Sequence, residues 1–235
     1  MQNNSNLVSV VMSAYNSEKT IAESIESILN QSYQNFEFLI IDDCSTDKTL
    51  EIIESYKKKN DKVKLFKNKT NLGLTKSLNI LIEKSSGQYI ARQDADDISL
   101  HHRVQEQMKL LKRDNLDFCT TRAIIKDSKK LRPGVSSFLP KKVALKFKNP
   151  FIHGTLLVKK TVINKIGNYD ENFYYAQDYK LFFDLLEYNY NFKVISKPHY
   201  ILNVKNNISE NKRAQQNYFA ECVRKKITPS KYLKG

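Results

Sequence analysis

The stretch FEFLIIDDCSTDKT (residues 36–49) decides the fold class of this 235-residue chain. It begins with an apolar, β-prone run and turns polar at two adjacent carboxylates, Asp42 and Asp43. Ser, Thr and Asp follow at 45–47, and these residue types cap helix N-termini. Apolar residues then recur at helical spacing over 50–56. A strand, a polar loop and a helix in this order form the repeating unit of an α/β protein.

The same unit repeats on both sides of this stretch. The other β-prone runs are residues 7–12, 63–66 and 89–91, and helical periodicity fills 21–29 and 74–82 between them. This alternation predicts a parallel sheet that binds its ligand at the carboxyl ends of the strands. Beyond residue 100 the pattern becomes α+β. There we expect helices at 101–112 and 178–188, strands at 118–125 and 192–195, and a loop at 127–140.

Composition limits the class of partner. The net charge of +14 and the pI of about 9.5 favour an anionic partner: nucleic acid, an acidic membrane or a phosphorylated substrate. The 3 cysteines are widely spaced, so neither a disulfide framework nor a zinc site is indicated, and a reducing cytoplasm fits. No segment approaches the ~18 apolar residues that span a bilayer, so any membrane contact is expected to be peripheral.

The polar clusters at the strand ends narrow the chemistry. The first glycine is Gly73, which excludes a GxGxxG loop or a Walker-type loop after the first strand. Asp94-Ala95-Asp96-Asp97 follows the strand at 89–91, and such carboxylates bind Mn²⁺ or Mg²⁺ together with substrate phosphates. The alternative is a turn that caps the next helix. Tyr15-Asn16 either contacts a base or caps a helix.

Six segments together resemble family 2 glycosyltransferases of the GT-A fold. They are VSVVMSAYN (8–16), SILNQSY (27–33), FLIIDDCSTDKT (38–49), NLGLTKSLN (71–79), GQYIARQDADD (87–97) and NYDENFYYAQDYKLFFDL (168–185). The resemblance covers residues 7–195. It implies an α/β, Rossmann-like, mostly parallel central sheet flanked by helices, with a smaller α+β acceptor part. Residues 1–100 would form the nucleotide-sugar-binding half, 101–202 the acceptor-binding and catalytic-base half of the same domain, and 203–235 a basic helical tail.

The resemblance also implies roles for individual residues. Asp43 would accept the uracil N3–H, Asp96 with Asp94 would bind Mn²⁺ or Mg²⁺, and Asp178 would be the general base. The acceptor site would include His153 and Gln177. The expected nucleotide-binding residues are Ser13, Tyr15, Asn16, Asp43, Asn71, Lys76, Arg92 and Asp94. Gln177 replaces a common glutamate and Asp184 a frequent arginine, which makes acceptor recognition the least transferable inference.

The implied activity is inverting transfer of one sugar from a UDP-sugar (UDP-Gal, UDP-Glc or UDP-HexNAc). The acceptor would be a hydroxyl of a glycan or lipid-linked glycan in bacterial lipooligosaccharide or capsule synthesis. Two other classes of protein fit the sequence less well. A nucleotidyltransferase normally needs a glycine-rich basic loop after the first strand, and a nucleic-acid-binding module leaves the aspartate clusters unexplained because carboxylates repel phosphate.

The basic tail leaves two alternatives open. On a helical reading, Tyr218, Phe219, Cys222 and Val223 form an apolar stripe with basic residues beside it. Such a stripe can lie on an anionic membrane surface or pack on its own domain. The first alternative implies a cytoplasmic protein peripheral to the inner face of the cytoplasmic membrane. A homodimer is a further expected partner, and nucleic acid is not.

Overall fold

The first half of the chain alternates strands and helices as predicted. The computed structural model describes residues 6–134, 140–204 and 212–230. The elements of the first half are β1 (Val8–Ala14), α1 (Ile21–Leu29), β2 (Phe36–Asp42), α2 (Thr49–Lys59), β3 (Val63–Lys67), α3 (Leu74–Lys84) and β4 (Tyr89–Arg92). Each predicted strand and helix is present, with ends displaced by a few residues.

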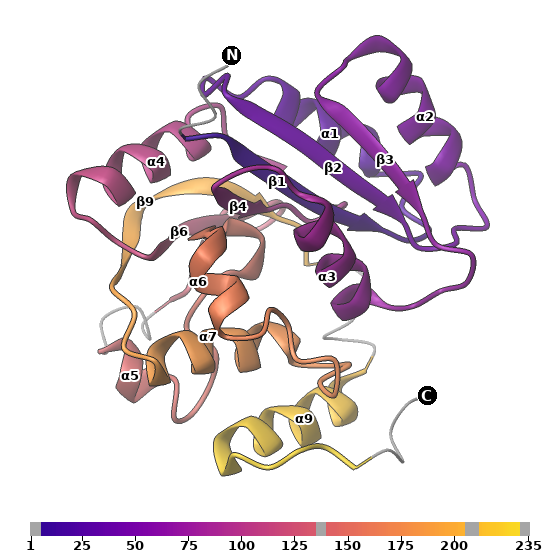
Figure 1. The fold of residues 1–235 in the computed structure, drawn as a ribbon. Coiled ribbons are helices and arrows are strands. Elements are labelled where there is room, and N and C mark those ends of the chain that lie inside the picture. Colours follow the sequence, from indigo (N-terminus) through magenta and orange to yellow (C-terminus); the bar gives the residue numbers. More distant parts are fainter. Residues whose placement is uncertain (1–5, 135–139, 205–211, 231–235) are drawn as a thin grey trace.

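The second half adds its strands to the same sheet (Figure 1). Its elements are β5 (Ile98–Ser99), α4 (Arg103–Arg113), β6 (Phe118–Ile125), β7 (Leu131–Arg132), α5 (Lys141–Ala144), a 3-10 turn (His153–Thr155), β8 (Leu157–Lys159), α6 (Lys160–Lys165), α7 (Gln177–Glu187), β9 (Phe192–Leu202) and α9 (Arg213–Lys225). The strand order is β3-β2-β1-β4-β8-β6-β9-β5, with β7 paired to β6.

The sheet is parallel in one half and mixed in the other. β1 pairs in parallel with β2 and β4, and β2 pairs in parallel with β3. β8 runs antiparallel to both of its neighbours, β4 and β6, whereas β9 is parallel to β6. The expectation of a mostly parallel sheet therefore holds for the first half, and the insertion of β8 makes the second half mixed.

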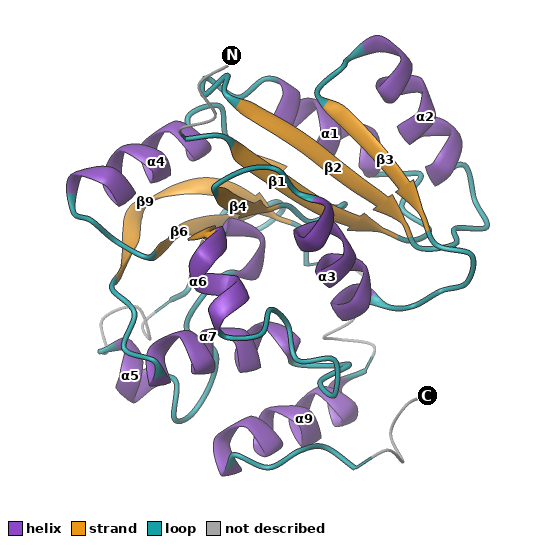
Figure 2. Cartoon of the chain, in the orientation of Figure 1, coloured by secondary structure: helices purple, strands orange, loops and turns teal. Residues whose placement is uncertain are grey.

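Helices cover both faces of the sheet (Figure 2). Successive residues of β1 point to opposite faces, so Val10 belongs to one buried cluster and Val11 to the other. Val10 packs with apolar residues of α1, α2 and α4, while Val11 packs with those of α3, α6, α7 and α9. This three-layer arrangement leaves the strand ends, rather than the sheet faces, free to form a site.

Two predictions about the second half are wrong. β9 does not end before Pro198 but continues to Leu202, because Pro198 lies opposite Arg122 at an irregularity in the β6–β9 register. The predicted loop at 127–140 contains β7, a two-residue strand. Elements α5, β8 and α6 lie in the stretch 141–177, where the sequence pattern predicts no helix or strand. Each has six residues or fewer, which is too short for hydrophobic periodicity to reveal it.

The C-terminal helix packs on the domain. In α9, Phe219, Cys222 and Val223 are buried within the same cluster as α7. The Phe219 ring contacts Phe173 and Tyr175 edge-on, with centroids 6.2 Å and 5.6 Å apart. The apolar stripe is therefore covered by protein rather than lipid. Residues 205–211 and 231–235 of the predicted tail lie outside the described part of the chain. In the described ranges, no helix combines the length and apolar character that a bilayer span requires.

Candidate active site

The loop after β2 places Asp43 at the carboxyl end of the parallel half. Its side chain is 2% exposed. Its carboxylate accepts hydrogen bonds from Asn68 Nδ2 at 2.7 Å, from Leu72 N at 2.8 Å and from Gly73 N at 2.8 Å. A carboxylate has about four acceptor positions, so one remains for a ligand N–H. Asp43 thus holds the 68–73 loop in place whether or not a base is bound.

The other residues expected at this end differ in their surroundings. The Tyr15 ring is 49% exposed, so one face is open for stacking. Asn16 instead joins two loops of the protein, because its Oδ1 accepts from Thr46 N at 2.9 Å. Ser13 is partly buried in β1 opposite Ile41. Asn71 and Lys76 are exposed, before α3 and in its first turn.

Tyr174 joins this end of the site from a distant part of the sequence. Gly73 has φ +83°, and a Cβ there would lie 2.6 Å from Tyr174 Cε2. Burial raises the pKa of Tyr174, and the nearby Tyr175 phenol and Asp43 carboxylate raise it further. Tyr174 was not predicted as a site residue. The only sequence signal for this contact is the glycine, whose left-handed backbone and missing side chain admit the ring.

Replacing Asp43 with alanine is expected to lower the free energy of unfolding by about 2–4 kcal/mol in the absence of nucleotide. The substitution leaves the buried N–H groups of the 68–73 loop without an acceptor. Urea unfolding measures the loss, and Asp61→Ala, at an exposed carboxylate after α2, is the matched control. Equal free energies of unfolding for the two variants would show that Asp43 does not stabilise the 68–73 loop and acts only in ligand binding.

At the end of β4, Arg92 lies beneath the acidic cluster. Its side chain is 1% exposed, and its NH2 group donates to Asp94 Oδ1 at 2.6 Å. Its NH1 group donates to the backbone oxygens of Val11, at 3.2 Å, and Gln93. Arg92 therefore supports Asp94 from within the core, and its role in nucleotide binding stays a prediction.

The acidic cluster is short of positive charge. Burial, then the negative charge of Asp94, raises the pKa of Asp96 to about 6. Burial and the charges of Asp94 and Asp96 also raise the pKa of Asp97, whose Oδ1 accepts from Asn203 N at 2.7 Å. No group of three His, Cys, Asp or Glu side chains gathers as a metal site within the described residues. Two carboxylates plus phosphate oxygens are, however, a donor set that Mg²⁺ and Mn²⁺ accept. Asp94 and Asp96 fit such an ion.

Asp178 lies in the first turn of α7. Its Oδ2 accepts from Asn149 Nδ2 at 2.7 Å. His153 Nε2 lies 2.7 Å from the Tyr169 hydroxyl. Burial lowers the pKa of His153 to about 4; the charge of Arg92 acts the same way, and those of Asp94 and Asp178 oppose it. His153 is therefore expected to be neutral at pH 7, and it is close enough to Asp94 and Asp178 for both charges to act on it.

Three residues that sequence reasoning missed hold this centre together. Arg103 NH1 donates to the backbone oxygens of Arg92, at 2.9 Å, and Gly154, at 2.8 Å. The Tyr200 hydroxyl accepts from Asp94 N at 3.2 Å. A Cβ on Gly154 would lie 2.6 Å from Asp94 Oδ2. Their signal was weak because each comes from a separate element and contacts the site only in the folded chain.

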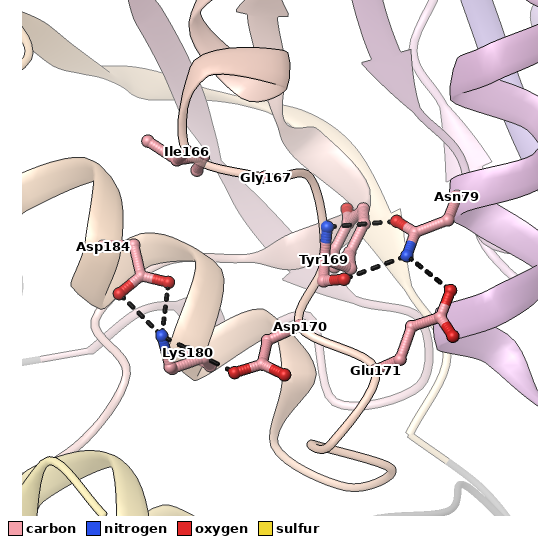
Figure 3. A pocket seen from close by; sticks show the side chains of 8 residues that line it. All are labelled: Asn79, Ile166, Gly167, Tyr169, Asp170, Glu171, Lys180 and Asp184. Atoms are coloured by element: carbon pink, nitrogen blue, oxygen red, sulfur yellow. Dashed lines mark hydrogen bonds and ion pairs between the residues drawn. The ribbon is translucent and has the colours of Figure 1, made fainter. Parts of the chain in front are cut away.

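A separate pocket lies on another side of α7 (Figure 3). It has a volume of about 370 Å³ and is lined by Asn79, Ile166, Gly167, Tyr169, Asp170, Glu171, Lys180 and Asp184. Asp184 pairs with Lys180 at 2.6 Å, so the carboxylate that replaces the family arginine is neutralised away from Asp178. Gln177 is half-buried as the first residue of α7. None of the strand-end carboxylates lines this pocket.

The α/β sheet with carboxylates at its strand ends agrees with the GT-A fold expected from the sequence. The family model described as Glycosyl transferase family 2 matches residues 9–179. The chain therefore belongs to this family.

Two curated relatives illustrate the similarity. The glycosyltransferase EpsE of Bacillus subtilis (strain 168) is 39% identical over 165 residues, which cover 69% of this chain and 59% of EpsE. The Escherichia coli UDP-Glc:alpha-D-GlcNAc-diphosphoundecaprenol beta-1,3-glucosyltransferase WfgD is 35% identical over 113 residues, covering 48% of this chain and 44% of WfgD. The chain thus spans about half the length of these relatives.

Solved structures share the fold. Staphylococcus aureus TarS, determined with UDP, superposes with a TM-score of 0.74 at 22% identity, over 92% of this chain and 64% of that one. TarS has also been determined with UDP-GlcNAc. The Pyrobaculum calidifontis mannosyltransferase PcManGT, determined with GDP-Man and Mn²⁺, has a TM-score of 0.71 at 17% identity, over 94% of this chain and 65% of that one. At these identities the likeness is one of fold.

Proposed function

We propose that this chain transfers one sugar, with inversion, from a UDP-sugar to a hydroxyl of a glycan or lipid-linked glycan acceptor. The observation that supports the proposal is that the Asp43 and Asp94–Asp96 carboxylates follow the carboxyl ends of β2 and β4, which are both parallel to β1. His153 lies near enough to Asp94 and Asp178 for both charges to act on it, which links Asp178 to Asp94. Family membership favours this activity over the nucleotidyltransferase and nucleic-acid-binding alternatives.

The donor would lie along the strand ends from β2 to β4. Its uracil would stack on the exposed ring of Tyr15 and donate N3–H to the remaining acceptor position of Asp43. The diphosphate would then reach Asp94 and Asp96, with the exposed Lys76 near the path. The UDP and UDP-GlcNAc bound by TarS support a uridine donor. UDP-Gal, UDP-Glc and UDP-HexNAc share this recognition, because they differ only in the sugar.

A divalent ion, Mn²⁺ or Mg²⁺, would be held by Asp96 and Asp94. When bound, it supplies positive charge that stabilises the departing diphosphate. The raised pKa of Asp96 supports this assignment, because a carboxylate disfavoured as an anion gains most from a cation. Arg92 would hold the Asp94 carboxylate in place through their ion pair.

In the chemical step, Asp178 is the group that accepts the proton of the acceptor hydroxyl. The acceptor oxygen attacks C1 of the sugar while Asp178 takes the hydroxyl proton. The bond from C1 to the diphosphate oxygen breaks on the opposite face, and UDP leaves with the electron pair. The donation from Asn149 to Oδ2 leaves Oδ1 available for that proton. His153 and Gln177 would contact the acceptor. The lipid-linked acceptor in the name of WfgD supports a role in bacterial surface polysaccharide synthesis, as lipooligosaccharide or capsule.

Thermal unfolding with UDP, GDP, CDP and TDP, each with and without Mn²⁺, tests the donor site. A ligand at ~100 times its Kd adds about 2.7 kcal/mol, so UDP with Mn²⁺ should raise Tm by roughly 5–10 °C. CDP should raise it less, because cytosine N3 has no hydrogen to donate to the Asp43 carboxylate that would accept the uracil N3–H. An equal shift for all four nucleotides would contradict uridine recognition, and an equal shift without Mn²⁺ would contradict the metal site.

A further inference from the structure

The segment around α5 exposes apolar side chains among unpaired cations. Phe147 is 71% exposed and Val143 44% exposed, and they are four residues apart. Lys142, Lys146 and Lys148 alternate with them and are exposed. Most large apolar side chains of the described chain are buried, so two exposed ones this close together are unusual. We call Lys142, Val143, Lys146, Phe147, Lys148 and Arg224 the α5 face.

Arg224 joins this face from α9. Its NH1 group lies 3.4 Å from the backbone oxygen of Phe147. Lys142 Nζ donates to Asn189 Oδ1 at 2.6 Å, which ties α5 to the turn after α7. The α5 face is therefore built on packed helices, at the end of the molecule where α5, α7 and α9 meet (Figure 1).

Among the described residues, the cations of this face form no ion pairs, although the charge of Arg224 acts on nearby Glu221. Lys225 and Lys226, next to it, pair with Glu221 and Glu187. Across the described ranges, no ion pair involves Lys142, Lys146, Lys148 or Arg224. Such a face is complementary to an anionic lipid surface. The lipid headgroups attract the lysines, and the boundary between headgroups and acyl chains accommodates the aromatic ring.

We propose that the α5 face docks this protein on an anionic phospholipid bilayer. Phe147 and Val143 would enter the headgroup region, and the cations would contact lipid phosphates. This surface differs from the tail stripe considered from the sequence, which α7 buries. Docking needs neither donor nor acceptor, so it stands apart from the proposed function. It would deepen that function, because Asn149, which binds Asp178, lies only two residues from Phe147, at most about 7 Å along the chain.

Partitioning onto vesicles tests the charges. The full chain should bind vesicles of phosphatidylglycerol and phosphatidylcholine, and much less those of phosphatidylcholine alone. Each basic residue near such a surface contributes about fivefold to partitioning, so Lys142→Gln, Lys146→Gln and Lys148→Gln combined should weaken it about 100-fold. The matched control neutralises Lys57, Lys58 and Lys59, which are exposed on α2 at the other end of the molecule (Figure 1). An equal loss in both triple variants would overturn the proposal, because net charge alone would then explain binding.

A fluorescent reporter tests the apolar contact. The chain has 0 tryptophans, so Phe147→Trp introduces a single one at an exposed position. Its emission should shift to shorter wavelength with phosphatidylglycerol vesicles and be quenched by brominated lipids, whereas Lys58→Trp on α2 should not respond. An unchanged Phe147→Trp spectrum on bound vesicles would overturn the proposal. So would a shift that follows protein concentration without lipid, because a second copy would then cover the face. UDP binding, measured in parallel, reports on the donor site separately.

Discussion

Asp178→Asn is expected to reduce kcat by 10²–10⁴-fold while UDP binding stays unchanged. Positioned general-base catalysis contributes about this much, and asparagine keeps the shape of the side chain without taking a proton. The hydrogen bond with Asn149 gives the assignment a structural basis, because it fixes one carboxylate oxygen and leaves the other free to accept a proton. Asp178 is not one of the residues proposed to bind the nucleotide, so the loss should appear in the chemical step alone. Single-turnover rates with a UDP-sugar and a glycan acceptor, alongside calorimetric UDP binding, separate the two.

The matched control is Asp184→Asn on the same helix. Asp184 pairs with Lys180 in the pocket of Figure 3, on another side of α7. The control should therefore retain turnover and lose at most a little stability. If Asp178→Asn keeps its rate, or if both variants lose activity equally, Asp178 is not the base.

Asp96→Asn is expected to lower kcat/KM by about 10²–10³-fold and to remove the effect of Mn²⁺ on UDP binding. A metal bound at a leaving group contributes several kcal/mol, and about 1.4 kcal/mol corresponds to tenfold. We expect the larger effect at Asp96 rather than at Asp94, because the positive charge of Arg92 already pairs with one carboxylate oxygen of Asp94. Calorimetry of UDP binding, with Mn²⁺ and then with a chelator, measures the change.

Asp61→Asn serves as the control, since that carboxylate is exposed after α2. It should leave both the UDP affinity and its dependence on Mn²⁺ as in the parent chain. A persistent Mn²⁺ requirement in Asp96→Asn would mean that other groups hold the ion.

The first half of the fold was predictable because its signals are local. Each strand of this half is an apolar run ending in polar residues, and each helix has an apolar face, as in 21–29. The second half depends on distant pairings. β8 has three residues and is defined by its neighbours β4 and β6, which no periodicity in 157–159 reveals. The extension of β9 past Pro198 likewise depends on an irregularity in its partner.

The site divides in the same way. Carboxylates at strand ends, such as Asp43 and Asp96, could be predicted because the ends of parallel strands meet at one edge. The buried position of Arg92 could not, since a basic residue in a motif is ordinarily expected to face its ligand. Tyr174, Tyr200 and Asn149 were missed because their contacts join elements far apart in sequence.

The place of β4 within the sheet has a practical consequence for protein engineering. β4 is hydrogen-bonded to β1 on one side and to β8 on the other, so it ends the first half in sequence but lies inside the sheet. A fragment that stopped at residue 100 would leave β4 as an open edge, with the apolar residues Ile90 and Ala91 uncovered. Open apolar edges recruit other chains into intermolecular sheets. We therefore expect residues 1–100, the proposed nucleotide-binding half, to aggregate when expressed alone. Chimeras that exchange this half should succeed only when β8 and β6 are carried along with β4.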